Sequence, residues 1–279
     1  MATPSLTEST LPGALGEILV TIRAGGRESP RPAVVLVHGF KGFRSWGFFP
    51  TLADRLAKAG FTTITYNASG SGVDAAGEFV HPDRFGHNTY SAELADLRTV
   101  LTALWAGELG VVPPSSLGLM GHSRGAGIAL LQAAHDPKVR ALVSWASIGA
   151  VARWPAETIA DWKGRGRLDI MNLRTRQVLP LYLDVLEEVE QQGTRRLDLE
   201  KAAALIEVPW LLLHGEEDES VSSTESEQLH AASGRGTTEL RIVQATGHTF
   251  GATHPMEETP EPLERTLRAT IDWFVAHLT

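Results

Sequence analysis

Short apolar segments alternate with amphipathic segments along most of this chain. The run that begins at Ala33 is continuously apolar and is bounded by Pro32 and Gly39, which is typical of a strand buried on both faces. Further strands are predicted at 61–67, 116–123, 139–147, 208–215 and 239–245, and helices at 48–60, 89–110, 124–135 and 262–278. Because strands that alternate with helices usually form a parallel sheet covered by helices, the predicted fold class is α/β.

The alternation stops between residues 147 and 204. This stretch is heavily charged, and we expect it to be helical. A long insertion between two strands of an α/β sheet is uncommon unless it has a function, so we interpret it as a cap or lid. Extra helices packed on the outside are the alternative. The predicted division is a core of residues 1–146, a helical cap/lid insertion of 147–204 and a second part of the core at 205–279.

One serine lies between two glycines at the end of a predicted strand. The segment Gly121-His122-Ser123-Arg124-Gly125 fits the pattern G-x-S-x-G, which is too short to be specific by itself in a chain with 27 glycines. Its context is more informative, because a strand leads into it and a helix follows. A serine hydroxyl becomes a nucleophile only when a base takes its proton and a third group orients that base.

A candidate acid and a candidate base follow the serine, each in a loop after a predicted strand. Asp218 comes shortly after the strand at 208–215, and Val221 is expected to anchor this loop inward. The carboxyl ends of strands are where catalytic groups gather in open α/β sheets. His248 lies in a glycine-flanked loop after the last strand. The alternatives with weaker context are Glu216, Glu217 and Glu219 for the acid and His81, His230 and His254 for the base.

These three motifs, in the chain order serine, acid, histidine, resemble the α/β-hydrolase superfamily. The resemblance extends over nearly the whole chain apart from the insertion. It implies an α/β-hydrolase fold with a mostly parallel central sheet, and it implies that Ser123 is the nucleophile, His248 the base and Asp218 the acid. It also implies an oxyanion hole formed by the backbone amides of Phe40 and Arg124, with Lys41 as the alternative to Phe40.

Other polar residues near these motifs are interpreted as structural. His38 and His122 are expected to be buried and hydrogen-bonded, and the Arg124 side chain either pairs with a carboxylate or reaches an acidic substrate group. The segment at 81–90 holds two histidines and an aspartate, but its spacing matches no metal motif. No metal and no cofactor are therefore predicted.

Composition excludes several other classes of protein. The net charge of −8 without a basic cluster opposes binding to nucleic acid or to an anionic membrane surface. With no cysteine, disulfides and thiolate catalysis are absent. No apolar run is long enough to span a membrane, and the first ten residues lack the features of a secretory signal. We expect a cytoplasmic protein that acts on a small molecule.

The predicted function is hydrolysis of a carboxylic ester through an acyl-enzyme on Ser123. By resemblance, the chain is similar to small carboxylesterases, including cinnamoyl and feruloyl esterases, and to dienelactone hydrolases and serine aminopeptidases. The charged insertion, with arginines at 165, 167, 174, 176, 195 and 196, favours a small or polar ester. Its tryptophans and Phe43, Phe48 and Phe49 could line an aromatic pocket or belong to the core. A peptidase, a C–C bond hydrolase and a non-catalytic binding protein remain as alternatives.

Overall fold

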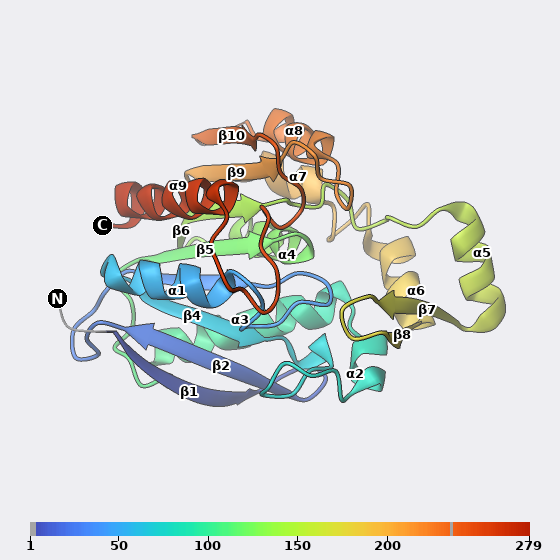
Figure 1. The fold of residues 1–279 in the computed structure, drawn as a ribbon, viewed down its shortest axis with the longest axis horizontal. Coiled ribbons are helices and arrows are strands. Elements are labelled where there is room, and N and C mark those ends of the chain that lie inside the picture. The colour runs from blue at the N-terminus through green and yellow to red at the C-terminus, as the bar shows by residue number, and fades with distance from the viewer. Residues whose placement is uncertain (1–3, 235–236) are drawn as a thin grey trace.

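The computed structural model describes residues 4–234 and 237–279, and within them an eight-stranded sheet forms the centre of the molecule (Figure 1). The strand order is β1-β2-β4-β3-β5-β6-β9-β10. All neighbours from β4 to β10 are parallel, whereas β2 is antiparallel to both β1 and β4. The strands are β1 (Ser5–Pro12), β2 (Glu17–Ala24), β3 (Ala33–Val37), β4 (Thr62–Asn67), β5 (Leu117–His122), β6 (Val139–Trp145), β9 (Trp210–Gly215) and β10 (Thr238–Val243).

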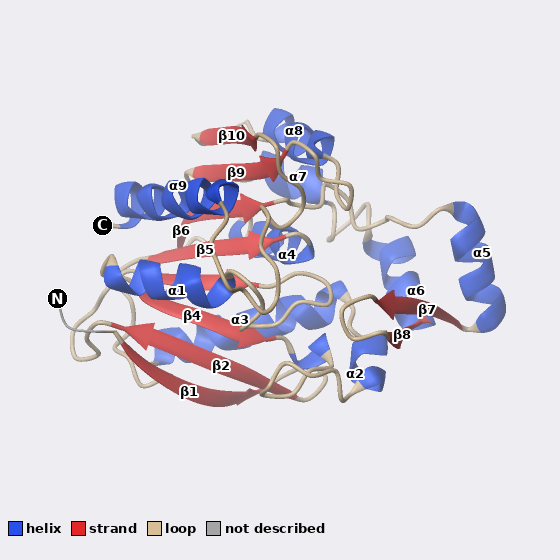
Figure 2. Ribbon diagram, viewed as in Figure 1, coloured by secondary structure: helices blue, strands red, loops and turns tan. Residues whose placement is uncertain are grey.

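Helices cover both faces of the sheet (Figure 2). Along β3, Val34 and Leu36 pack against α1 and α9, whereas Val35 and Val37 belong to the core on the opposite face, under α3, α4 and α7. Successive side chains of a strand point to opposite faces, so a strand covered on both sides is apolar throughout. The helices of these layers are α1 (Phe49–Lys58), α3 (Tyr90–Ala106), α4 (Arg124–Ala133), α7 (Leu199–Ala204), α8 (Ser223–Ala232) and α9 (Glu261–Leu278). The predicted α/β class and mostly parallel sheet are confirmed.

The first two strands were not predicted from the sequence pattern. They form an antiparallel hairpin in which Ser5 pairs with Ala24 and Pro12 with Glu17. Most side chains of β1 are exposed because this strand lies at the edge of the sheet. An exposed edge strand needs few apolar residues, so its pattern contrasts little with that of a loop.

The insertion at 147–204 is not purely helical, which corrects the sequence expectation. It holds α5 (Ala156–Arg165), an antiparallel hairpin of β7 (Arg167–Asn172) and β8 (Gln177–Tyr182), α6 (Leu183–Gln192) and α7. Leu168 and Ile170 alternate with polar residues in β7, and Leu179 and Leu181 alternate in β8. This period of two is the signal of a strand, and it was masked by the surrounding charges.

The insertion has a small apolar core of its own. Trp162 of α5 and Leu181 of β8 are buried with Phe43 and Phe79 from loops of the main domain and with Phe85 from the short helix α2 (Pro82–Gly86). This cluster fixes α5, α6 and the hairpin at the carboxyl ends of the parallel strands (Figure 1). In contrast, α7 packs on α4 and α8 as part of the layer that covers the sheet. Across the part of the chain that the structure describes, no helix combines the length and apolarity needed to cross a bilayer.

Candidate active site

Ser123 lies at the sharp turn between β5 and α4. Its backbone angles are φ 57° and ψ −123°, which a residue with a side chain rarely adopts. Its amide nitrogen donates a hydrogen bond to the carbonyl oxygen of Trp145 at 2.8 Å, which ties the turn to the end of β6. The turn places Ser123 on the wall of a cavity.

The glycines on either side of Ser123 let this turn pack closely against its surroundings. A Cβ on Gly121 would overlap the backbone of Gly125, and a Cβ on Gly125 would overlap the carbonyl oxygens of Val37 and His38. A side chain at Gly121 would therefore push the turn apart, and one at Gly125 would push the turn away from the end of β3. The G-x-S-x-G spacing is required by packing, because backbone atoms occupy the space at both positions.

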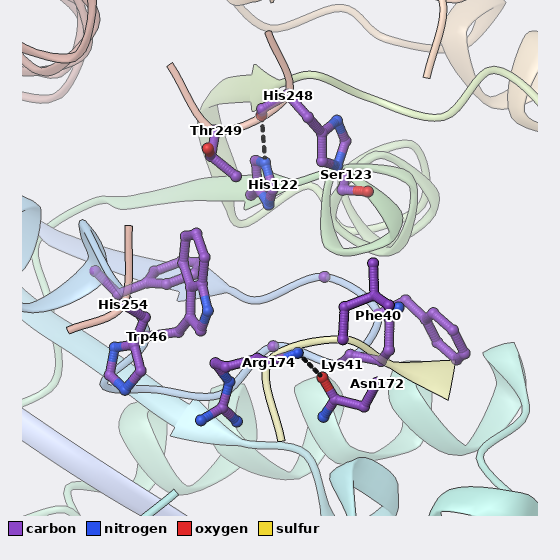
Figure 3. Close-up of a pocket in the computed structure, with 14 residues that line it drawn as sticks. Phe40, Lys41, Trp46, His122, Ser123, Asn172, Arg174, His248, Thr249 and His254 are labelled. Carbon is purple, nitrogen blue, oxygen red and sulfur yellow. Dashed lines mark hydrogen bonds between the residues drawn. The ribbon is translucent and has the colours of Figure 1, made fainter. Parts of the chain in front are cut away.

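The structure brings Asp218 and His248 to the same end of the sheet as Ser123. Asp218 lies in the loop after β9 and His248 in the loop after β10, and a Cβ on Gly215 would overlap the second loop. The Nδ1 atom of His248 lies 2.7 Å from Oδ2 of Asp218. Because a carboxylate only accepts hydrogen bonds, the proton of His248 is on Nδ1 and its Nε2 is free to accept another. Figure 3 shows the ring of His248 beside Ser123, and both residues line the cavity.

Asp218 is held as a carboxylate by several donors. Its Oδ1 accepts hydrogen bonds from the amides of Ser220 at 2.8 Å and Val221 at 2.9 Å, and Val221 is buried, as predicted for the anchor of this loop. Burial alone would raise the pKa of Asp218. Hydrogen bonds from His214, His248 and the Val221 amide outweigh this and hold the pKa well below its usual range. The carboxylate is therefore available to orient His248 over the whole neutral range.

His214 is a positioning residue that the sequence analysis did not single out. Its ring is fully buried, with Nε2 lying 2.8 Å from the carbonyl oxygen of Val221 and 3.2 Å from Oδ2 of Asp218. Both neighbours are acceptors, so Nε2 carries the proton and Nδ1 accepts from the hydroxyl of Ser226 at 2.7 Å. The sequence signal for this role was the position of His214 four residues before Asp218. That signal could not be interpreted without the turn that folds Asp218 back over the His214 ring.

His38 and His122 are buried and hydrogen-bonded, as expected. The Ala68 amide donates to Nε2 of His38 at 3.1 Å, so Nδ1 is protonated and donates to the Gly39 carbonyl at 3.0 Å. Nε2 of His122 donates to the His248 carbonyl oxygen at 2.9 Å and so supports the loop of the candidate base. Burial lowers the pKa of His38 to about 4 and, with the nearby His248 ring, that of His122 to about 3, which keeps both neutral.

The Arg124 side chain is turned away from solvent and paired. Its Nε atom lies 3.0 Å from Oε1 of Glu93, and its Nη2 donates to the carbonyl oxygen of Asn88 at 2.7 Å. The guanidinium also stacks on Tyr90, with Cζ 3.9 Å from the ring centroid. Of the two sequence interpretations, pairing with a carboxylate is the one found here.

Phe40, Lys41 and Arg124 line the cavities at Ser123, and their backbone amides donate no hydrogen bond within the described chain. A Cβ on Gly39 would lie 3.0 Å from Cβ of Ser123, so the loop that follows β3 presses directly on the turn. Arg124 is the first residue of α4, where helical amides are unpaired and the helix dipole is positive. The arrangement can therefore stabilise an anion close to Ser123.

A cavity of about 390 Å³ opens beside Ser123 and His248 (Figure 3). Its walls come from the loops after β3, β5 and β10 and from the turn of the β7–β8 hairpin. It is lined by Gly39, Phe40, Lys41, Gly42, Trp46, Phe49, His122, Ser123, Asn172, Leu173, Arg174, His248, Thr249 and His254. A second cavity, of about 490 Å³, shares Ser123 and His248 and extends toward Trp154 and Arg153. Ser123 thus lies where two cavities meet.

The aromatic and charged residues named from the sequence divide between wall and core. Phe43, Phe48 and Phe49 are all buried in core clusters, and of the three Phe49 also lines the first cavity. Of the six arginines noted in the insertion, Arg174 reaches this cavity. His254, set aside as a base, stacks near Trp46 in the wall. No local pattern marked His254, Asn172 or Arg174, because only the folded insertion and C-terminal loops place them there.

The segment at 81–90 has its two histidines and its aspartate outside both cavities, and its last residue, Tyr90, lines the second one. It forms the short helix α2 (Pro82–Gly86), and Nδ1 of His87 lies 2.8 Å from a carboxylate oxygen of Asp184 on α6. Within the described residues, no three metal-ligating side chains converge. No metal site is assigned to this segment.

Sequence comparisons match this chain to one protein family and to curated relatives. Residues 34–266 match the family described as the alpha/beta hydrolase family. The chain is 24% identical to 2,6-dihydropseudooxynicotine hydrolase of Paenarthrobacter nicotinovorans over 203 residues, which are 72% of this chain and 48% of that protein. It is 31% identical over 127 residues to an uncharacterized 31.7 kDa protein of Escherichia coli, with 46% and 41% covered. The chain spans about half the length of these relatives or less.

Solved structures share the whole fold at low sequence identity. Est1E from Butyrivibrio proteoclasticus with bound ferulic acid has a TM-score of 0.73 at 16% identity, covering 96% of this chain and 98% of that one. A dienelactone hydrolase from Anabaena variabilis has a TM-score of 0.63 at 17% identity, covering 99% and 100%. The family match extends over most of the chain and includes the strands and turns that carry Ser123, Asp218 and His248. The chain therefore belongs to the alpha/beta hydrolase family.

Proposed function

We propose that this protein is a serine hydrolase that cleaves a small or polar carboxylic ester through an acyl-enzyme on Ser123. The observation that carries the proposal is the strained turn at Ser123, next to a histidine whose Nδ1 is bonded to a carboxylate. Strain at a single non-glycine residue persists where function depends on it and the surroundings hold it.

The chemistry follows from the protonation states of the three side chains. His248 accepts the proton of the Ser123 hydroxyl on Nε2 as the oxygen attacks the ester carbonyl carbon. Asp218, bonded to Nδ1, stabilises the positive charge that forms on the ring. The imidazolium then gives the proton to the departing alcohol, and water repeats the sequence on the acyl-enzyme. His122 and His214 position the loops of the base and the acid.

The tetrahedral intermediate carries its negative charge on the former carbonyl oxygen. The amides of Phe40 and Arg124 are the proposed donors, because both are unpaired in the described structure and lie in the two loops that meet at Ser123. The amide of Lys41 is equally unpaired and is the alternative to Phe40. Backbone donors of this kind stabilise the intermediate without having to reorganise during the reaction.

The insertion at 147–204 is proposed to act as the cap of this site. Asn172, Leu173 and Arg174 of the hairpin turn line the cavity, and Trp154 lines its neighbour. A cap of this kind limits the size of the acyl or alcohol group and excludes water from the reacting atoms.

The test is hydrolysis of p-nitrophenyl esters from acetate to palmitate, together with methyl ferulate. Ser123→Ala is expected to lower kcat by several orders of magnitude with an unchanged circular dichroism spectrum. Ser45→Ala, at an exposed serine that lines neither cavity, is the matched control and is expected to keep full activity. Full activity in Ser123→Ala would refute the assignment of Ser123 as the nucleophile.

A fluorophosphonate probe distinguishes an enzyme with an activated serine from a non-catalytic binding protein. Labelling of the parent and of Ser45→Ala, but not of Ser123→Ala, supports an activated serine even if no ester in the series is hydrolysed. In that case peptides and C–C substrates are the next substrates, since the same three residues would serve them. A parent that neither labels nor hydrolyses any of these compounds would point to a binding protein.

A further inference from the structure

Two cationic side chains line the first cavity without a carboxylate to pair with. Among the residues that the structure describes, no aspartate or glutamate lines this cavity, and neither Lys41 nor Arg174 forms an ion pair. Glu78 is close enough to act on the pKa of His254, but it is not in the wall. In a protein of net charge −8, an uncompensated positive cavity needs an explanation.

The neighbouring cavity shows the contrast. Its two arginines are each neutralised: Arg124 pairs with Glu93 at 3.0 Å, and Arg153 pairs with Glu225. Lys41 lies where the two cavities meet and borders both. The excess positive charge is therefore concentrated on the side of Ser123 that carries Arg174.

A buried amide beside these cations lacks a hydrogen-bond acceptor. Asn172 is only 5% exposed and lines the same cavity. Its Oδ1 accepts from the Arg174 amide at 3.2 Å, whereas its Nδ2 has no partner among the described residues. A buried donor without an acceptor costs free energy, so such groups are usually completed by a ligand or water. Nδ2 can only donate, which matches an oxygen with negative charge.

The environments of the two cations, Lys41 and Arg174, also favour a negatively charged ligand. Lys41 is about half-buried, and burial lowers the pKa of its ammonium group. Arg174 is exposed at the hairpin turn and is held over the rings of Phe43 and Phe79, with Cζ 5.2 Å and 5.8 Å from their centroids. An anion between them would recover solvation for Lys41 and give Arg174 a charge-assisted hydrogen bond.

The position of these groups sets the shape of the ligand. In Figure 3, Lys41, Asn172 and Arg174 form one side of the cavity, and Ser123 and His248 form the other. The apolar side chains of Phe40 and Trp46 lie between these two sides (Figure 3), and Phe49 also lines the cavity. A ligand that contacts both sides has a reactive carbonyl at one end, an apolar spacer and an anionic oxygen group at the other.

We propose that Lys41, Asn172 and Arg174 form an anchor for a carboxylate of the substrate, so that the preferred substrates are esters that carry a second, ionised carboxyl group. The inference rests on the proposed ester hydrolysis at Ser123 and names its substrate class. The anchor holds the free carboxylate while the ester carbonyl lies against Ser123. Two kinds of compound have this chemistry, the monoesters of dicarboxylic acids and the acyl esters of hydroxy acids.

The test compares each anionic ester with a neutral ester of the same length, in which a carboxamide replaces the free carboxylate. One series consists of the monomethyl esters of succinate, adipate, suberate and terephthalate, and the other of acetate esters of 4-hydroxybenzoate and 6-hydroxyhexanoate. The parent is expected to prefer the anionic partner by about tenfold or more in kcat/KM at the best length in one series. Because Arg174 is exposed, 0.5 M NaCl is expected to reduce this preference.

Variants of the anchor locate the preference. Asn172→Asp is nearly isosteric but places a negative charge where Nδ2 lies, and Arg174→Gln removes the exposed cation. Both are expected to lower the ratio of anionic to neutral kcat/KM by about tenfold. Arg176→Gln is the matched control, since it removes the same charge from the same hairpin turn at a residue outside the cavity. An unchanged ratio in both anchor variants, or an equal loss in Arg176→Gln, would overturn the anchor.

Binding measurements separate the anchor from catalysis. Calorimetry with Ser123→Ala measures the affinity for monomethyl terephthalate and for methyl 4-carbamoylbenzoate without turnover. Tighter binding of the anionic compound, lost when Arg174→Gln is added, supports the anchor even if the proposed hydrolysis fails. Hydrolysis of neutral esters by the parent, without an anionic preference in either series, would retain the proposed function and reject the anchor.

Discussion

His38 and His122 are buried beside Ser123 as neutral side chains, and we expect them to make the protein less stable in mild acid. Burial lowers the pKa of His38 to about 4, and burial together with His248 lowers that of His122 to about 3. In the unfolded chain, both take up a proton below about pH 6.5. The unfolded state therefore binds more protons between these pKa values, so the free energy of unfolding falls as the pH drops through 6.5.

The size of the effect follows from the difference between the ordinary histidine pKa and the pH. At pH 5 this difference is about 1.5 pH units, and each unit corresponds to about 1.4 kcal/mol. Each histidine is thus expected to cost about 2 kcal/mol of unfolding free energy between pH 8 and pH 5, and the pair about 4 kcal/mol. This is a large share of the roughly 5–15 kcal/mol that stabilises a typical domain.

Guanidinium unfolding followed by tryptophan fluorescence at pH 8, 7, 6 and 5 measures this loss. His38→Gln and His122→Gln each remove one titrating ring while keeping a side-chain donor. Each is expected to lower stability at pH 8 but to remove about 2 kcal/mol of the decrease between pH 8 and pH 5. Glu93 and Asp96, whose pKa values burial raises, titrate in every variant and cancel in the comparison. If both variants lose as much stability as the parent, the two rings are not neutral in the folded protein.

Two further predictions concern the residues around Ser123. Asp218→Asn is expected to lower kcat by about 10³–10⁴ with little change in KM, because an amide can donate to Nδ1 of His248 and stabilise the wrong tautomer; an unchanged kcat in steady-state ester hydrolysis would contradict this. Gly125→Ala is expected to cost about 1–3 kcal/mol of stability, since its Cβ would overlap the His38 carbonyl. Gly164→Ala, in α5 with nothing within 4 Å of the added Cβ, is the control and is expected to be neutral or stabilising by thermal melting.

The buried parallel strands could be read from the sequence because their pattern is local. Each residue of β3 is covered on one face or the other, so the apolar run that begins at Ala33 coincides with the strand. The turn at Ser123 was equally visible, since the glycines at 121 and 125 are required by contacts within the turn and with β3. Strand β1 was missed because an exposed edge contributes little apolar contrast.

The insertion shows where charge conceals a pattern. Its arginines and acidic residues suggested helices throughout, and Leu168, Ile170, Leu179 and Leu181 were not recognised as the inner side of a hairpin. These residues pack with loops and the short helix α2 of the main domain, including Phe43, which lies more than a hundred positions earlier in the chain. A strand that becomes stable only through such contacts has a weak signal in its own sequence.

The sequence by itself determined the order of the buried parallel strands, the turn at Ser123 and the loops in which Asp218 and His248 lie. Periodicity and glycine placement act over a few residues, so they are readable without the fold. The tertiary structure decided which distant side chains meet. It placed His214 under Asp218 and paired Arg124 with Glu93. Among the described residues, it left Lys41 and Arg174 without an ion pair and Nδ2 of Asn172 without an acceptor, all on one cavity. These contacts depend on how whole elements pack, because residues far apart in the chain come together only when the apolar cores between them are buried.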